Sequence, residues 1–155
     1  MAIVTELLLP VFYASLCSAA FAIIYNVYGT GILVCALGGA LGWLSYLLSA
    51  PLLHSDIGQM FVAAVTISVY AEIMARVRKF PVTGYQMVAA LPMVPGGGIY
   101  YTMEHAINGE IDAFLESFLH TLGLAGAIAV GVLLVSSVVR MYQAIHHPAG
   151  KGPQP

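Results

Sequence analysis

The 155-residue sequence has very little formal charge. Only 8% of its residues are Asp, Glu, Lys or Arg, whereas hydrophobic residues make up 60% of the chain. Soluble globular domains have about 25% charged residues and about 45–50% apolar residues. The mean hydropathy of +0.91 points the same way. A chain of this length cannot bury so much apolar surface in one core, so the sequence excludes a water-soluble monomer and predicts an integral membrane protein.

Other scarce features exclude further classes of protein. Five Lys and Arg residues against seven Asp and Glu provide no basic surface for nucleic acid. High hydrophobicity with low charge also excludes intrinsic disorder. The two cysteines, Cys17 and Cys35, fall in apolar segments, and we interpret them as small hydrophobic side chains rather than a disulfide or metal pair. The sequence shows no nucleophile–base arrangement and no metal-ligand spacing, so we expect neither an enzyme nor a bound metal or cofactor.

The charged residues are clustered, and the stretches between the clusters have the lengths of membrane-spanning helices. A hydrocarbon core about 30 Å thick is crossed by about 20 helical residues. We therefore predict an all-helical membrane domain over 1–146 and a flexible cytoplasmic tail over 147–155. Five spans are expected, at about 4–25, 31–50, 57–75, 82–103 and 118–141.

The N-terminal segment contains Ala20-Phe21-Ala22, which resembles a signal-peptide cleavage site after an apolar run. A secretory signal peptide begins with basic residues, whereas this segment carries Glu6 instead. We therefore expect the first segment to be a retained membrane helix.

The positions of the basic residues predict the orientation, because cytoplasmic loops carry an excess of Lys and Arg. Three basic residues lie between the third and fourth spans, and two follow the fifth: Arg76, Arg78, Lys79, Arg140 and Lys151. The segment 104–117 carries acidic residues but no Lys or Arg. We therefore expect an inner-membrane protein with its N-terminus and 104–117 outside, and with 76–81 and its C-terminus in the cytoplasm.

Rows of small residues predict close packing of helices, which in lipid depends on small side chains. Gly38 and Gly42 lie four residues apart in the second span, and Gly123, Ala127 and Gly131 form a similar row in the fifth. Packing within one chain would account for these rows. Because five short spans enclose little interior, we also expect some rows to contact another subunit, and a homo-oligomer is one possibility.

The fourth span contains a segment, Leu91–Gly98 (LPMVPGGG), that a continuous helix does not tolerate. Relative to Ala, each Pro in a helix costs about 3 kcal/mol and each Gly about 1 kcal/mol, so this segment would cost roughly 9 kcal/mol. Pro92 disfavours the helical conformation of Leu91, whereas Pro95 suits the first turn of a new helix. At 1.5 Å per residue the break would lie about 16 Å from Val82, near the middle of the membrane.

This break has two possible roles, because irregular backbone at that depth persists only where protein buries it or where it lines a wet cavity. It could be a structural kink. It could instead be a binding site, as in transporters whose half-helix N-termini face an anionic group of the substrate. The substrate carboxylate would then lie at the break, and two tyrosines would line the outer half of the path. The residues of this hypothetical site are Pro92, Pro95, Gly96, Gly97, Gly98, Tyr100 and Tyr101.

Two carboxyl groups are candidates for coupling transport to an ion gradient. Glu72 lies four residues before Arg76, so a helical ion pair is the simpler interpretation and a proton relay is the alternative. Glu104 lies near the outer end of the fourth span. It is either an interface residue or an outer gate or proton site.

The segment Leu91–Tyr100, with the sequence LPMVPGGGIY, resembles the signature of the threonine/serine exporter (ThrE) superfamily. It is preceded by Ala75-Arg76 and by Lys79-Phe80-Pro81, as in that signature. The similarity is to the small, YjjB-type membrane subunit, and 21–26 and 36–43 are similar to the first two spans of that subunit.

The resemblance implies a membrane subunit of a secondary transporter that exports threonine/serine, or a related small carboxylate such as succinate, driven by an ion gradient. It also implies a larger companion membrane subunit with its own spans. Two other functions stay open. The protein could be a structural or assembly subunit without its own substrate site, or a small channel-like membrane protein.

Overall fold

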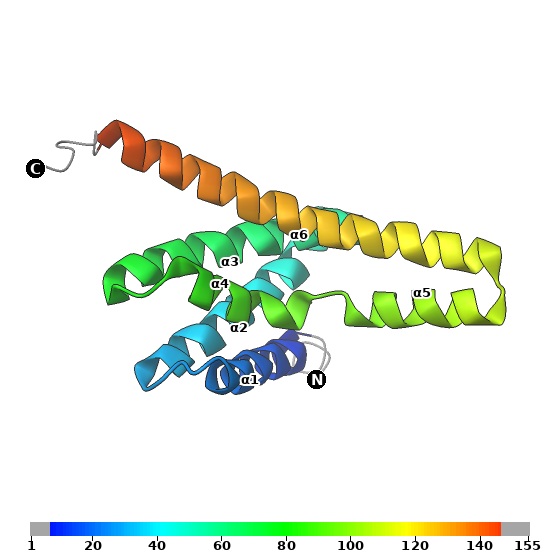
Figure 1. Ribbon diagram of the computed structural model, residues 1–155, viewed down its shortest axis with the longest axis horizontal. Helices are drawn as coiled ribbons and strands as arrows, with labels where there is room; N and C mark the ends of the chain where they lie inside the picture. The colour runs from blue at the N-terminus through cyan, green and yellow to red at the C-terminus, as the bar shows by residue number, and fades with distance from the viewer. Residues whose placement is uncertain (1–6, 147–155) are drawn as a thin grey trace, which may run out of the picture.

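The computed structural model describes residues 7–146, and this part of the chain contains helices and no strands. The predicted all-helical fold is therefore confirmed for these residues. The tail expected over 147–155 lies outside the described residues. In chain order the elements are α1 (Leu9–Ile24), α2 (Thr30–Ser49), α3 (Asp56–Arg78), α4 (Val82–Ala90), the 3₁₀-helix η2 (Leu91–Met93), α5 (Gly96–Asn108) and α6 (Ile111–His146) (Figure 1).

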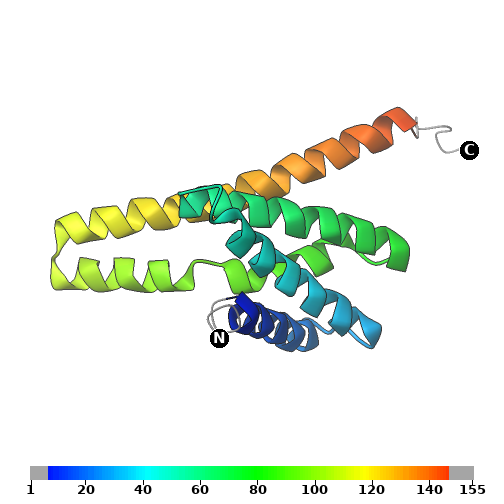
Figure 2. The same cartoon turned by 180° about the vertical axis from the view of Figure 1, so that it is seen from behind.

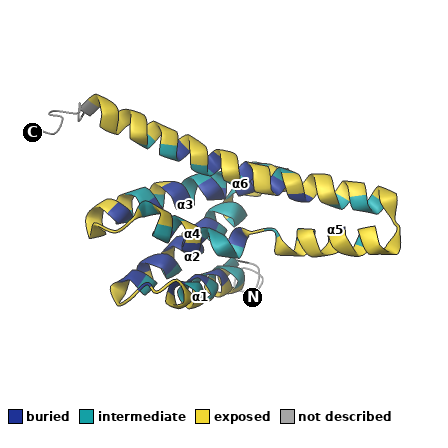
Figure 3. Cartoon of the chain, in the orientation of Figure 1, coloured by how far each residue is buried: buried dark blue, intermediate teal, exposed yellow. Residues whose placement is uncertain are grey.

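Three of the helices, α2, α3 and α6, are long and apolar enough to cross a membrane, and α1 is a shorter apolar helix. The longest is α6, whose 36 residues extend about 54 Å at 1.5 Å per residue. It begins at Ile111, before the expected start of the fifth span. Exposed residues extend along most of α6 (Figure 3), and they include large apolar side chains that lipid or another protein could cover, such as Val130, Leu133 and Val138.

The α3 helix lies between α2, α4 and α6 and packs against all three. It runs parallel to α6, because Asp56 lies beside His120 at one end and Gly131 packs on Ala64 further along. The chain then returns through α4, η2 and α5, antiparallel to both. Figures 1 and 2 show the paired α5 and α6 projecting from one end of the bundle, while the last turns of α6 diverge from α3 at the other.

The predicted rows of small residues pack inside this chain. Gly38 lies against Ala89 and Tyr70, Gly42 lies against Ile67, and Gly131 lies against Ala64. A side chain at any of these glycines would overlap its neighbour, so close approach of the helices requires them. A partner subunit would therefore contact other surfaces of the molecule.

The segment 104–117 is helical except for a tight turn, where the sequence alone suggested a connection between spans. Gly109 adopts a left-handed conformation (φ +74°), which ends α5 and lets α6 begin two residues later. Asp112 lies in the first turn of α6, where a negative charge is favourable. Acidic residues were used to mark the ends of the expected membrane spans, but acidic side chains do not interrupt a helix. The helices α5 and α6 therefore continue into the segment that was expected to connect two spans.

Charged side chains gather at two opposite ends of the molecule. On the side toward which α5 and α6 project, His120 lies 3.6 Å from Asp56 where α3 begins, and Nδ1 of His105 lies 2.6 Å from Oε2 of Glu110 at the α5–α6 turn. At the other end, Arg76 and the last turns of α6 line a shared hollow. Every Lys and Arg among residues 7–146 belongs to this second end: Arg76, Arg78, Lys79 and Arg140.

Candidate functional site

The chain leaves the α-helical conformation between α4 and α5. After α4 ends at Ala90, the η2 turn continues to Met93, and Val94 is the residue with an extended backbone (φ −60°, ψ 127°). Leu91, by contrast, keeps a helical conformation (φ −53°, ψ −42°), so the expectation that Pro92 would displace it was wrong. Pro92 occupies the first turn of η2, which tolerates its missing N–H, and Pro95 imposes the extended conformation on Val94.

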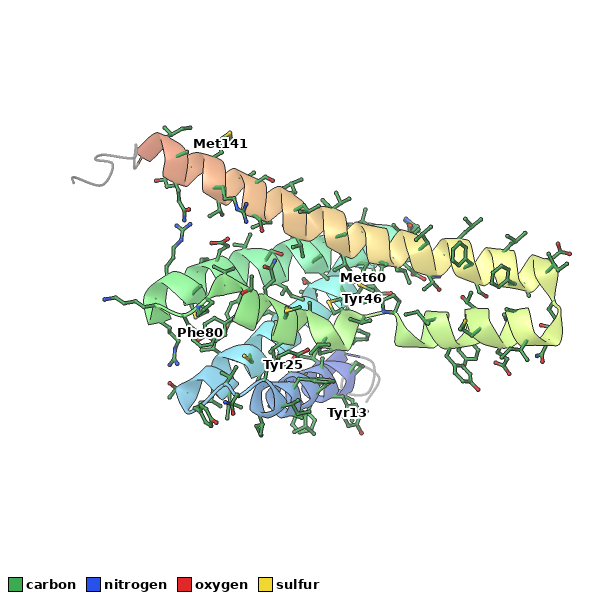
Figure 4. The ribbon with its side chains drawn as sticks, in the orientation of Figure 1. Tyr13, Tyr25, Tyr46, Met60, Phe80 and Met141 are labelled. Atoms are coloured by element: carbon green, nitrogen blue, oxygen red, sulfur yellow. The ribbon has the colours of Figure 1, made fainter. Side chains whose placement is uncertain are left out.

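Buried packing holds the turn in place. Met93 is 3% exposed and lies in one apolar cluster with Met60 and Ile67 of α3. Trp43 and Tyr46 of α2 pack against the same cluster (Figure 4 labels Met60 and Tyr46). The break is therefore enclosed on one side by α2 and α3 rather than by solvent.

The three glycines after Pro95 differ from one another. The N–H of Gly96 donates to the carbonyl of Val94 at 2.7 Å, whereas the N–H groups of Gly97 and Gly98 donate to no backbone carbonyl within residues 7–146. Gly96 and Gly97 are exposed, and a side chain at either would meet no atom within 4 Å. Gly98 packs on α6, where a Cβ atom would overlap the hydroxyl of Thr121. The start of α5 thus presents two free amides and no side-chain cap.

Two hollows flank the break. One, of about 350 Å³, lies between Pro92, Trp43 and the α1 residues Tyr13 and Cys17. The other, of about 310 Å³, lies between α5 and α6, where apolar side chains and two threonines line it: Val94, Pro95, Ile99, Thr102, Met103, Phe118, Thr121, Leu122 and Ala125. Each hollow is near the lower limit of about 300 Å³ for small-molecule sites.

Two buried polar atoms next to these hollows have no hydrogen-bond partner within the described part of the chain. They are Nε1 of Trp43 and Oγ1 of Thr121. Buried polar groups are normally hydrogen-bonded, so an unpaired group beside a hollow identifies a place where a ligand could bind. Sequence reasoning missed Thr121, because a threonine in an apolar helix gives no signal of whether its hydroxyl is bonded.

Other polar groups in the bundle are satisfied and hold α4 against its neighbours. The hydroxyl of Ser18 donates to the carbonyl of Val88 at 3.3 Å, which joins α1 to α4. The side-chain amide of Gln86 donates to the hydroxyl of Ser68 at 2.9 Å, which joins α4 to α3. These bonds fix the helix that precedes the break.

The two tyrosines do not lie at either hollow beside the break. Tyr100 and Tyr101 are 65% and 57% exposed, and their ring centroids lie 5.5 Å apart in an edge-to-face arrangement. Tyr100 instead lines a separate, small hollow on α5 with Glu104. The structure therefore groups the proline and glycine residues together but places the tyrosines further along α5.

The two acidic candidates also lie away from the break. Glu72 pairs with Arg76 at 3.7 Å, as the four-residue spacing predicted, and its side chain is only 15% exposed. It lies five residues beyond Ile67, or about 7 Å along α3. Glu104 is exposed and lies six residues beyond Gly98, or about 9 Å along α5.

An all-helical chain whose long helices are this apolar belongs to the class of membrane proteins. Residues 10–138 match the family model described as Threonine/Serine exporter, ThrE, and this match includes the whole break. The chain therefore belongs to the threonine/serine exporter family, which is a family of membrane transport proteins and not of enzymes. Searches of curated proteins and of solved structures found no significant match.

Proposed function

We propose that the protein is a membrane subunit of a secondary exporter for threonine/serine or a related small carboxylate such as succinate. The observation that carries this proposal is the pair of free amides, of Gly97 and Gly98, at the uncapped start of α5. Amides at a helix N-terminus bind carboxylates, because they donate hydrogen bonds and carry partial positive charge. Family membership supports the transport activity, and the uncapped start of α5 supports a carboxylate site at the break.

Five spans are proposed for the topology: α1, α2, α3, the α4–η2–α5 segment and α6. The nine residues of α4 and the thirteen of α5 are each too short to cross about 30 Å of hydrocarbon, but together they are long enough. Their antiparallel packing along α3 and α6 supports a crossing of the membrane. Met93 of the break shares a buried cluster with Leu124 and Ala127 of α6, which supports a position within the membrane.

The separation of charge supports an orientation in the inner membrane. The end of the molecule that carries Arg76, Arg78, Lys79 and Arg140 would face the cytoplasm. The α5–α6 turn, with its acidic residues and no Lys or Arg, would lie outside. The N-terminus would then be outside and the C-terminus inside.

A larger companion subunit is proposed as the partner, because the hollows in this chain are small and open. The long outward face of α6 offers a surface for that subunit, for a second copy of this chain or for lipid alone. An assembly subunit without its own site is the competing function, and it predicts that the residues at the break do not affect transport. A small channel is distinguished by passive, unsaturable flux.

The test is efflux of threonine, serine and succinate from cells that express this protein with its companion. Gly97→Val should abolish efflux, because a branched side chain at this open position would block approach to the free amides. Gly126→Val is the matched control, since Gly126 also has nothing within 4 Å but lies on α6 away from the start of α5. If both variants transport at the wild-type rate and the protein is assembled, the substrate site lies elsewhere, and the assembly role is favoured.

A further inference from the structure

The hydroxyl of Thr121 differs in its hydrogen bonding from the hydroxyls of five other serine and threonine residues in the helices. Five others donate to a carbonyl one turn back in their own helix, at 2.7–2.9 Å, and so need no other partner: Ser45, Ser49, Thr66, Ser68 and Thr102. Thr121 is equally able to bond to its own helix, but it makes no hydrogen bond within the described residues. Thr121 is only 9% exposed, so its hydroxyl is largely shielded from bulk solvent.

The unpaired hydroxyl faces the start of α5. It lies against Gly98, which has no side chain to separate it from the α5 backbone. It also lines the hollow between α5 and α6 together with Pro95, the residue that precedes the first turn of α5. An unpaired hydroxyl from one helix thus lies against Gly98, in the first turn of the other helix, where two backbone amides are unpaired.

We propose that Thr121 is a substrate-binding residue, whose hydroxyl joins the amides of Gly97 and Gly98 in binding the substrate carboxylate. A carboxylate accepts about four hydrogen bonds through its two oxygens, so three donors from two helices suit it. This inference rests on the proposed function, and it adds a residue on α6 to a site that the sequence placed wholly in the fourth span.

The arrangement also indicates which part of the substrate binds here. The residues lining the hollow between α5 and α6 include two threonines and otherwise only apolar side chains, so an ammonium group would find no acidic partner among them. The site therefore recognises a carboxylate attached to a small aliphatic body. In an amino acid, the ammonium group would need a partner outside this hollow.

The decisive variant is Thr121→Val, which keeps the shape of the side chain and removes the hydroxyl. We expect the KM for efflux to rise about tenfold, because a hydrogen bond to a charged group is lost. Thr121→Ser should restore the wild-type KM. Thr66→Val is the matched control: Thr66 lies on α3, lines neither hollow beside the break, and its hydroxyl is already bonded to the carbonyl of Val62, so its KM should stay near wild type.

A second measurement separates binding from a structural role. In purified protein without substrate, Thr121→Val should raise the Tm, because it removes a buried hydroxyl that has no partner. A hydroxyl that stabilised the fold would give the opposite sign, and a lower Tm together with a KM like that of Thr66→Val would overturn the proposal.

The result for Gly97→Val distinguishes this inference from the proposed function. If Gly97→Val abolishes efflux while Thr121→Val keeps the wild-type KM, the break binds substrate without Thr121, and only the present inference is wrong. If the wild-type protein with its companion shows no saturable efflux of threonine, serine or succinate, the proposed function fails and this inference fails with it.

Discussion

The hydroxyl of Thr121 on α6 lies directly against Gly98 on α5, at the point where the fourth helical segment resumes after its break. The two residues come from segments that the sequence separates by the whole α5–α6 turn. Their contact sets how closely α5 approaches α6, and it places the unpaired hydroxyl against the first turn of α5. The first prediction concerns this contact.

Gly98→Ala should destabilise the protein, because the added methyl group would overlap the Thr121 hydroxyl and force α5 away from α6. Overpacking of this kind costs about 1–3 kcal/mol in the free energy of unfolding. The measurement is thermal unfolding of the purified protein. Gly97→Ala provides the control, since a methyl group there meets nothing within 4 Å, and it should not lower the Tm.

Combining Gly98→Ala with Thr121→Ala tests whether this one contact is responsible. Removal of the hydroxyl makes room for the new methyl group, so the double variant should regain part of the lost stability. Equal Tm values for Gly98→Ala and Gly97→Ala, or additive losses in the double variant, would contradict the close contact.

Pro95 rather than Pro92 should control the break. Pro95 holds Val94 in an extended conformation, whereas Leu91, before Pro92, is already helical. Pro95→Ala should therefore weaken the extended preference of Val94 and favour a continuous helix, which a higher helix content and a changed Tm of the purified protein would record. If transport requires the break to move, the turnover of efflux should fall at the same time. Pro92→Ala should have the smaller effect on both Tm and turnover, and the reverse order would refute this assignment.

The sequence predicted the all-helical fold and placed the starts of the second, third and fourth helical segments within one residue of where they lie, because apolar runs and clustered charges delimit helices in lipid. The start of α3, expected at 57 and found at Asp56, is typical. The prediction for Leu91 was wrong because it considered only the effect of a proline on the preceding residue. It did not include the packing of Met93, which holds η2 in place. Such packing depends on residues distant in the chain.

Other features were beyond sequence reasoning for a different reason. The helical start of α6 was missed because charge was used as the only marker of its boundary. The role of Thr121 could not be predicted, since whether a hydroxyl is bonded depends on the helix that faces it. The separation of Glu72 and Glu104 from the break likewise follows from the direction and packing of α3 and α5, which composition does not encode.

The topology is tested by cysteine labelling in intact cells, after Cys17 and Cys35 are replaced by Ala. Asp112→Cys, at the start of α6, should react with a membrane-impermeant reagent, because the acidic α5–α6 turn is expected outside. Lys79→Cys, after the end of α3, should react only once the cells are opened. Labelling of Lys79→Cys from outside, or protection of Asp112→Cys, would overturn the proposed orientation.

Proton coupling is the last prediction, and Glu72 is the stronger of the two candidates. Its side chain is only 15% exposed in a helix of membrane-spanning length, whereas Glu104 is exposed near the α5–α6 turn. A carboxylate within a membrane span destabilises the protein unless a partner stabilises it or a function requires it. Arg76, at 3.7 Å from Glu72, is such a partner.

Comparing the two members of this pair separates a structural ion pair from a proton relay. If Glu72 carries the coupling proton, Glu72→Gln should abolish efflux driven by a pH gradient but leave substrate exchange intact, while Arg76→Gln should keep the pH-driven efflux. If the pair is only structural, both variants should lose stability alike and keep their pH dependence. Glu104→Gln should reduce pH-driven efflux less than Glu72→Gln does, because the Glu104 side chain is exposed near the α5–α6 turn whereas Glu72 is largely buried within α3. Unchanged pH dependence in both Gln variants would rule out coupling through either carboxyl group.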